Sequence, residues 1–133
     1  MADMTAPNSP APARARVLLV DDERPWLDSL RLTLEKEFEL DTATSAEEAE
    51  LFMASRAYDL VVSDHLMPGA TGLDFLIRAQ DRYPRTQRIL ITGYVNPELI
   101  SRSVSLAGLA CCLVKPLHAE QLVQAIWSAL GRK

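Results

Sequence analysis

The feature that most restricts the fold of this chain is an alternation of short apolar segments with segments of helical periodicity. The apolar segments that we predict as strands are Val17–Val20, Phe38–Ala43, Leu60–Ser63, Arg88–Ile91 and Leu109–Val114. Between them, apolar residues recur at the three- and four-residue spacing of amphipathic helices. Strands that alternate with helices favour a parallel sheet with right-handed crossovers and helices on both faces. We therefore predict a doubly wound α/β fold with five strands and five helices.

The helix boundaries follow from capping residues, prolines and glycines. Ser45 and Glu48 have capping-box spacing, and Asn96-Pro97 is an N-cap followed by proline at the first helical position. The predicted helices, with their caps, are Trp26–Lys36, Ser45–Ser55, Gly72–Tyr83, Asn96–Gly108 and Ala119–Leu130.

Length and composition indicate one globular domain. The chain has 133 residues, and three of its eight prolines fall within the first 12. We therefore predict a disordered Pro/Ala-rich tail over residues 1–14 and a folded domain over residues 15–133.

The net charge of −4 argues against direct nucleic-acid binding. The longest apolar run, Leu106–Val114, is too short to span a membrane, and the N-terminus lacks a secretory pattern, so we expect no membrane association and a cytoplasmic location.

The two cysteines, Cys111 and Cys112, are adjacent in a predicted strand. Neighbouring strand residues point to opposite faces of a sheet, so a disulfide between them is not expected. His65 and His118 are each isolated in sequence, which argues against a zinc site. We interpret both cysteines as small buried side chains.

Polar residues follow four of the predicted strands. They are Asp21 and Asp22, Asp64, Thr92 and Lys115. Each one alone has an ordinary explanation, such as a helix cap, a turn residue or a solvated charge. Because the carboxyl ends of parallel strands share one edge of the sheet, we expect all of them to lie together.

This combination of residues indicates phosphoryl chemistry supported by a cation. Clustered carboxylates repel one another, and hard oxygen ligands favour Mg²⁺, or Mn²⁺, over zinc or copper. The Asp64 carboxylate can act as a nucleophile toward phosphorus. Thr92 and Lys115 would then hold the phosphoryl oxygens, and Gly93 leaves space beside Thr92 for the incoming group.

Four ordered motifs carry a resemblance to a known family. They are Val17–Glu23 (VLLVDDE), Asp64–Gly72 (DHLMPGATG), Ile91–Gly93 (ITG) and Leu113–Pro116 (LVKP). The second fits the pattern D-x-x-M-P-x-x-x-G at every fixed position. Residues 16–131 resemble the receiver domain of the response regulators of two-component signalling, and we expect a single-domain regulator.

The resemblance implies a flavodoxin-like fold with strand order 2-1-3-4-5 and a role in a phosphorelay. Asp64 corresponds to the phospho-acceptor, and Asp21, Asp22 and the backbone carbonyl of Leu66 correspond to the further Mg²⁺ ligands. Thr92 corresponds to the switch hydroxyl, and Lys115 to the lysine that pairs with the phosphoryl group. Lys115-Pro116 is expected to be cis. The implied partners are a histidine kinase or phosphotransfer protein and a downstream protein target. Such a chain catalyses only its own phosphorylation and dephosphorylation, so we do not expect an enzyme.

One position departs from the family. Cys112 stands where the family commonly has a Tyr or Phe that reports phosphorylation to a surface formed by helix four, strand five and helix five. Tyr94, on the same loop as Thr92, is our candidate for a replacement switch. Trp127 lies at the edge of the last helix's apolar face, where it either packs in the core or contacts a partner or a second copy in a phosphorylation-dependent homodimer.

Four alternatives remain at this stage. The chain could be the receiver of a longer hybrid kinase or multidomain regulator. A phosphatase of the haloacid-dehalogenase type also forms a phospho-aspartate, but its first-strand D-x-D motif is replaced here by Asp21-Asp22-Glu23-Arg24. A phosphorylation-independent interaction module conflicts with the intact acceptor site. An FMN-binding protein ranks last because the first loop lacks a phosphate cradle.

Overall fold

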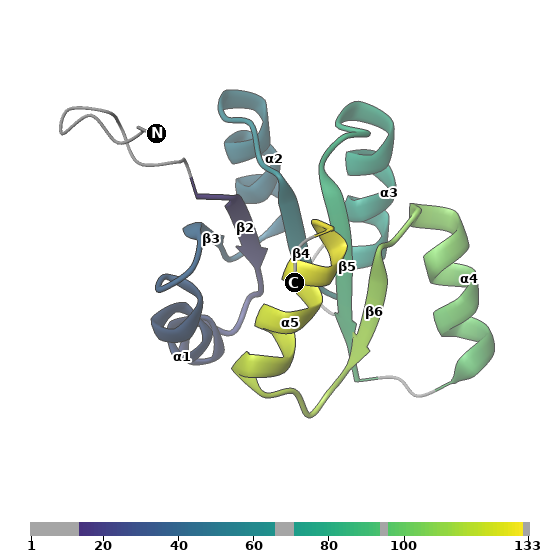
Figure 1. Ribbon diagram of the computed structural model, residues 1–133. Coiled ribbons are helices and arrows are strands. Elements are labelled where there is room, and N and C mark those ends of the chain that lie inside the picture. The colour runs from purple at the N-terminus through teal and green to yellow at the C-terminus, as the bar shows by residue number, and fades with distance from the viewer. Residues whose placement is uncertain (1–13, 66–70, 94–95, 132–133) are drawn as a thin grey trace, which may run out of the picture.

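Five short apolar segments form one parallel sheet, and a helix follows each strand (Figure 1). The computed structural model describes residues 14–65, 71–93 and 96–131. The elements, in chain order, are β2 (Arg16–Val20), α1 (Arg24–Leu34), β3 (Glu39–Ala43), α2 (Ala46–Ser55), β4 (Leu60–Asp64), α3 (Gly72–Arg82), β5 (Gln87–Thr92), α4 (Pro97–Ala107), β6 (Cys111–Val114) and α5 (Ala119–Ala129).

The strands lie in the order β3-β2-β4-β5-β6, and each hydrogen-bonded pair is parallel. Counted along the chain this is 2-1-3-4-5, so the predicted fold and strand order are confirmed. The order reverses beside β2, because the chain moves first to one side of this strand and then to the other. In such sheets the crevice at the carboxyl ends of the strands next to this reversal is the usual place for a site.

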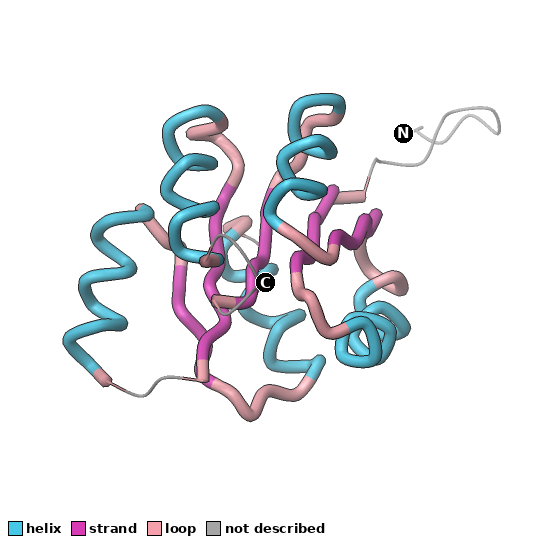
Figure 2. The backbone as a smooth tube through the Cα atoms, turned by 180° about the vertical axis from the view of Figure 1, so that it is seen from behind, coloured by secondary structure: helices cyan, strands magenta, loops and turns pink. Residues whose placement is uncertain are grey.

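Helices cover both faces of the sheet. Figure 1 shows α1 and α5 on the face toward the viewer, and Figure 2, seen from behind, shows α2, α3 and α4. Alternate strand residues supply the two cores: Val17 and Leu19 join the layer of α1 and α5, whereas Leu18 and Val20 join the other layer. The central strands β2, β4 and β5 are largely buried on both faces, which explains their apolar runs. The edge strand β3, ELDTA, is half-buried or exposed over most of its length and carries polar residues.

Most helix ends agree with the capping analysis. Ser45 Oγ accepts a hydrogen bond from the Glu48 amide, at 3.1 Å. The Glu48 carboxylate accepts from the Thr44 amide, at 2.7 Å, which is one residue before the expected position. Asn96 Oδ1 accepts from two amides of the first turn of α4, and Gly108 ends this helix with φ of 56°. That left-handed conformation favours glycine.

Several boundaries differ from the sequence prediction by one or two residues, and three of these differences have a clear physical reason. Helix α1 spans Arg24–Leu34, two residues earlier at both ends, because Pro25 occupies its first turn. Strand β6 begins at Cys111 rather than at Leu109. The Leu109 amide instead donates to the Val104 carbonyl, at 3.1 Å, and its side chain is buried beside the end of α4. The third difference is at the N-terminus, where Arg14 already belongs to the fold because its guanidinium donates to the Glu35 carbonyl, at 2.9 Å.

Residues 1–13 of the expected tail, which was predicted over 1–14, lie outside the described residues, so their disorder stays a prediction. Within the described ranges no helix has the length and apolar character required to cross a bilayer.

Candidate functional site

The sheet brings the predicted polar residues to one edge. The strands point the same way in Figure 1, so that β2, β4, β5 and β6 end on the same side. Register pairing places Asp64 beside Ile91, and the Lys115 amide donates to the Thr92 carbonyl, at 2.8 Å. Asp21 directly follows β2, and its amide donates to the Ala43 carbonyl, at 3.0 Å. Residues from four strands therefore converge because parallel pairing aligns the strand ends.

Three carboxylates form the acidic part of this site. Asp21 and Asp64 are buried, at 2% and 5% exposure, whereas Asp22 is exposed. Each offers a carboxylate oxygen, and these oxygens all lie within 4.8 Å of one another. Like charges at this distance repel in a partly desolvated setting, so the group favours a cation or a proton.

Burial has a direct effect on Asp21. Burial is the main cause that raises the pKa of this carboxyl from 3.8 to about 6. The charge of Asp64 acts in the same direction, whereas a hydrogen bond from the Glu23 amide and the Lys115 charge act against it. That hydrogen bond joins the Glu23 nitrogen to Asp21 Oδ1, at 2.9 Å. The cost of keeping Asp21 charged is therefore built into the fold.

Lys115 faces the buried acceptor candidate. Its Nζ lies 2.8 Å from Asp64 Oδ1. Burial alone would lower the pKa of the lysine, but the hydrogen bond and charge of Asp64, with the charges of Asp21 and Glu23, raise it overall. The ammonium is therefore held charged beside the carboxylate. The Lys115-Pro116 peptide bond is cis, as expected.

Thr92 and two glycines complete the edge. Thr92 is buried at 4% exposure, and a Cβ added at Gly93 would meet nothing within 4 Å, so there is open space next to the hydroxyl-bearing residue. Gly72 has the opposite surroundings. A Cβ there would overlap the Asp64 carbonyl oxygen and would lie 2.8 Å from Ser63 Oγ. Glycine at the start of α3 therefore lets this helix approach the end of β4, a requirement that the motif alone did not explain.

A cleft of about 810 Å³ opens beside the carboxylates, between the start of α1 and the connection from β6 to α5. Its lining residues are Glu23, Pro25, Trp26, Ser29, Gly93, Lys115, Pro116 and Leu117. Lys115, Gly93 and Trp26 were expected near the site from sequence, whereas the contribution of Leu117 to the apolar wall was not. The polar end of the cleft is formed by Glu23 and Lys115, which are sequence or contact neighbours of the three aspartates.

Comparison with known proteins decides the family. Residues 17–127 match the family model of the response regulator receiver domain. The chain belongs to this receiver domain family. Receiver domains are the signalling modules of two-component systems, which supports the expected role in a phosphorelay.

The relatives of this receiver domain include longer regulators. It is 37% identical over 117 residues to the hydrogenase transcriptional regulatory protein HoxA of Cupriavidus necator, covering 88% of this chain and 24% of that protein. It is 32% identical over 120 residues to the response regulator protein PilR of Pseudomonas aeruginosa, covering 89% and 26%. The chain thus spans about a quarter of the length of these relatives.

Solved structures give the same result for the fold. The signal receiver domain of an HD domain-containing protein from Pseudomonas fluorescens Pf-5 superposes with a TM-score of 0.82 at 34% identity, covering 89% of this chain and 95% of that one. A CheY-like receiver domain protein from Methanospirillum hungatei superposes with a TM-score of 0.83 at 28% identity, covering 90% and 95%.

The candidate switch residues of the receiver do not form one group. Leu66 and Tyr94 lie outside the described residues, so their expected roles stay predictions. Cys111 and Cys112 lie on opposite faces of the sheet, as predicted, but both are half-buried rather than buried. Burial raises the pKa of both thiols. Cys112 lies on the side of α4, where it borders a void of about 10 Å³ that Thr92 also lines.

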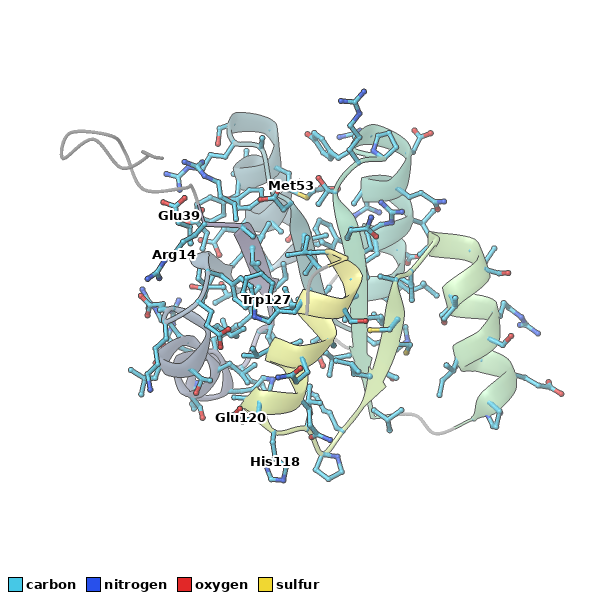
Figure 3. All side chains as sticks on the ribbon, in the orientation of Figure 1. Arg14, Glu39, Met53, His118, Glu120 and Trp127 are labelled. Atoms are coloured by element: carbon cyan, nitrogen blue, oxygen red, sulfur yellow. The ribbon has the colours of Figure 1, made fainter. Side chains whose placement is uncertain are left out.

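Trp127 faces α1 rather than α4. Figure 3 shows it reaching from α5 across toward the α1 side. Its ring centroid lies 4.9 Å from that of Phe38, and its Nε1 donates to Glu37 Oε1, at 2.7 Å. These contacts support the packing interpretation, because the ring fills the gap between α5 and the segment before β3. A direct part for Trp127 in the surface of α4, β6 and α5 stays a prediction without support from this geometry.

Proposed function

We propose that this receiver accepts a phosphoryl group on Asp64 from a histidine kinase or phosphotransfer protein. The observation that carries the proposal is the convergence of a buried carboxylate, a lysine at 2.8 Å and two further aspartates at the ends of parallel strands. In the transfer, an Asp64 oxygen forms a bond to phosphorus. The bond between phosphorus and the donor's imidazole nitrogen breaks, and the imidazole leaves with the electron pair.

The donor set fits Mg²⁺. Receiver domains bind this ion at an acidic pocket, and Asp21, Asp22 and Asp64 offer oxygens within 4.8 Å of one another. The raised pKa of Asp21 also fits, because a carboxylate that is costly to charge when alone gains from a nearby cation. The carbonyl of Leu66 is the fourth ligand that we propose from the family pattern. When bound, Mg²⁺ would supply positive charge opposite the phosphoryl oxygens.

The chain's own residues have separate parts in this proposal. The Lys115 ammonium, now paired with Asp64, moves its hydrogen bond to a phosphoryl oxygen and so stabilises the product. Thr92 offers its hydroxyl to a second oxygen, and the open space at Gly93 admits the group. The consequence for signalling is a change in the surface formed by α4, β6 and α5, which a downstream protein or a second copy of the chain then contacts.

Phosphorylation with a small donor tests the assignment. Incubation with acetyl phosphate and Mg²⁺ should add one phosphoryl mass to the parent and none to Asp64→Asn. Asp81→Asn, which removes the same charge from an exposed position on α3, is the matched control and should be modified like the parent. Equal modification of Asp64→Asn and the parent would show that the acceptor lies elsewhere.

One observation favours a wider context for the same function. The curated relatives are about two to four times as long as the matched region, and several are transcriptional regulators. We therefore keep as a second proposal that the receiver acts within a longer regulator. Mass measurement of the protein purified from its native cells distinguishes a chain of 14.8 kDa from a longer product.

A further inference from the structure

The C-terminal end of α4 is attached to the sheet by a buried arginine. Arg88, in β5, is 7% exposed and donates to three carbonyls: Nε to Ala107 at 2.8 Å, Nη1 to Thr86 at 2.6 Å and Nη2 to Gly108 at 3.0 Å. Two of these carbonyls belong to the end of α4, where the helix dipole is negative and a cation is favoured.

A second side chain reaches the same helix end. Gln80, in α3, has its amide nitrogen 2.9 Å from the Leu106 carbonyl and 3.3 Å from the Ala107 carbonyl when the amide is oriented to donate. Gly108 makes room for both groups, since a Cβ there would lie 2.6 Å from the terminal amide group of Gln80 and 3.3 Å from Arg88 Nη2. Carbonyls that a helix normally leaves unsatisfied are thus bound from β5 and α3.

Burial makes this attachment costly to replace. Desolvation lowers the pKa of Arg88 from its usual value. Among residues 14–65, 71–93 and 96–131, no carboxylate forms an ion pair with its guanidinium, so the carbonyls are the groups that stabilise the charge. Movement of the helix end would break these hydrogen bonds and leave buried donors unsatisfied. The free-energy cost of that loss holds the helix end in place.

The opposite half of α4 packs more weakly. The buried residues of this helix, Ser103 and Ala107, are small, and both lie past its midpoint. In the half next to the acceptor, Leu99 and Ile100 are only half-buried and the other residues are exposed. Ser103 donates to the Leu99 carbonyl of its own helix, at 2.8 Å, and so makes no hydrogen bond to the sheet. The void beside Thr92 and Cys112 lies under this half. By contrast, α1 buries three leucines. The half of α4 next to the acceptor site therefore has fewer contacts that oppose movement.

We propose that Arg88 and Gln80 fix the C-terminal end of α4 to the sheet, so that α4 turns about this end when the aspartyl site is occupied. Arg88 is a positioning residue in this scheme, since it lies in β5 away from the acceptor and acts through the helix. The turning rests on the proposed function of Asp64, whereas the attachment itself does not. Movement at the near end, transmitted through a helix held at the far end, would change the α4 surface without an aromatic residue at position 112.

Residue-resolved amide exchange of the unphosphorylated protein tests the attachment. Helix ends normally fray, so amides 106–109 should exchange faster than amides 101–103 in a free helix. We expect the reverse order in the parent. In Arg88→Met, amides 106–109 should exchange at least about tenfold faster than in the parent, which corresponds to about 1.4 kcal/mol. Arg102→Met, the same change at an exposed site on α4, is the control and should match the parent.

Two outcomes would overturn the attachment: frayed exchange at 106–109 in the parent, or parent-like exchange in Arg88→Met. If Arg88→Met does not fold, Gln80→Leu removes the uncharged donor and should still accelerate 106–109.

Beryllofluoride with Mg²⁺ tests the turning. In the parent, exchange should change at 101–103 and stay constant at 106–109, whereas in Arg88→Met it should change at both. Equal changes at both ends of the parent helix, or the parent's pattern in Arg88→Met, would refute the turning. Bound fluoride is followed separately by ¹⁹F NMR. If none binds, the proposed function and the turning fail together, while the exchange of the unphosphorylated protein still decides the attachment.

Discussion

Removing the charge of Asp21 should stabilise the metal-free protein against unfolding. This carboxyl is 2% exposed, and burial is the main reason that its pKa is raised from 3.8 to about 6. A tenfold change in proton affinity corresponds to about 1.4 kcal/mol, so the displacement to about 6 sets an upper limit of about 3 kcal/mol on the cost of the charge at neutral pH. Asp21→Asn keeps an oxygen that can accept from the Glu23 amide and removes that cost.

The pH dependence follows from the direction of the shift. The folded protein holds the Asp21 proton more tightly than the unfolded chain. The contribution of Asp21 to the free energy of unfolding therefore falls as pH rises from 3.8 through about 6. The gain from Asp21→Asn should therefore be present above this range and should disappear below it.

Urea unfolding, followed by circular dichroism in EDTA, measures both effects. At about pH 7.5 we expect the Asn variant to be about 1–3 kcal/mol more stable than the parent, and at about pH 4.5 the difference should be clearly smaller. The control Asp81→Asn should show a small difference that does not change with pH in this way. A gain of the same size at both pH values, or a loss at neutral pH, would refute the argument from burial.

Three further predictions concern the same edge of the sheet. Asp22→Ala should weaken Mg²⁺ binding at least about tenfold in isothermal titration calorimetry, because a direct carboxylate ligand is lost, and unchanged affinity would contradict its placement. Gly72→Ala should lower the free energy of unfolding by about 1–3 kcal/mol or more, because α3 must move away from the Asp64 carbonyl, and an unaltered urea midpoint would count against the close approach. Leu66→Asn together with Tyr94→Ala should speed loss of the phosphoryl group, since the parent side chains are expected to exclude the hydrolytic water. A decay rate indifferent to both changes would reject that role.

The fold could be predicted from sequence because local and global patterns agree. The apolar runs of the central strands predict elements that tertiary packing also requires, and the Asn96-Pro97 cap and Gly108 do the same for the ends of α4. The prediction that β6 begins at Leu109 was wrong because it relied on apolar composition. Leu109 continues the apolar run, but it follows directly on the turn at Gly108 and precedes the strand. Hydrophobicity alone does not distinguish a buried helix cap from the start of a strand.

The site could be predicted less completely. Strand ends identify Asp64 and Lys115 as neighbours, because parallel register is implied by the fold. The direction of Trp127 could not be inferred, since a residue at the margin of an apolar helix face can pack to either side. The role of Arg88 was also missed, because an arginine at the start of an apolar strand gives no indication of which distant carbonyls it will bind.

The two tryptophans lie in different surroundings, so their fluorescence should report two different events. The chain contains Trp26 and Trp127, and these lie in different environments. Trp26 lines the cleft beside the carboxylates, so its emission should respond to quenchers and ligands that enter there. Trp127 is bound to Glu37 and packed on Phe38, so its emission should change mainly when α5 separates from α1. Trp127→Phe would leave Trp26 as the single emitter, at the cleft, and Trp26→Phe would leave Trp127, between the helices. Fluorescence of the first variant would then report ligand entry, and fluorescence of the second would report unfolding.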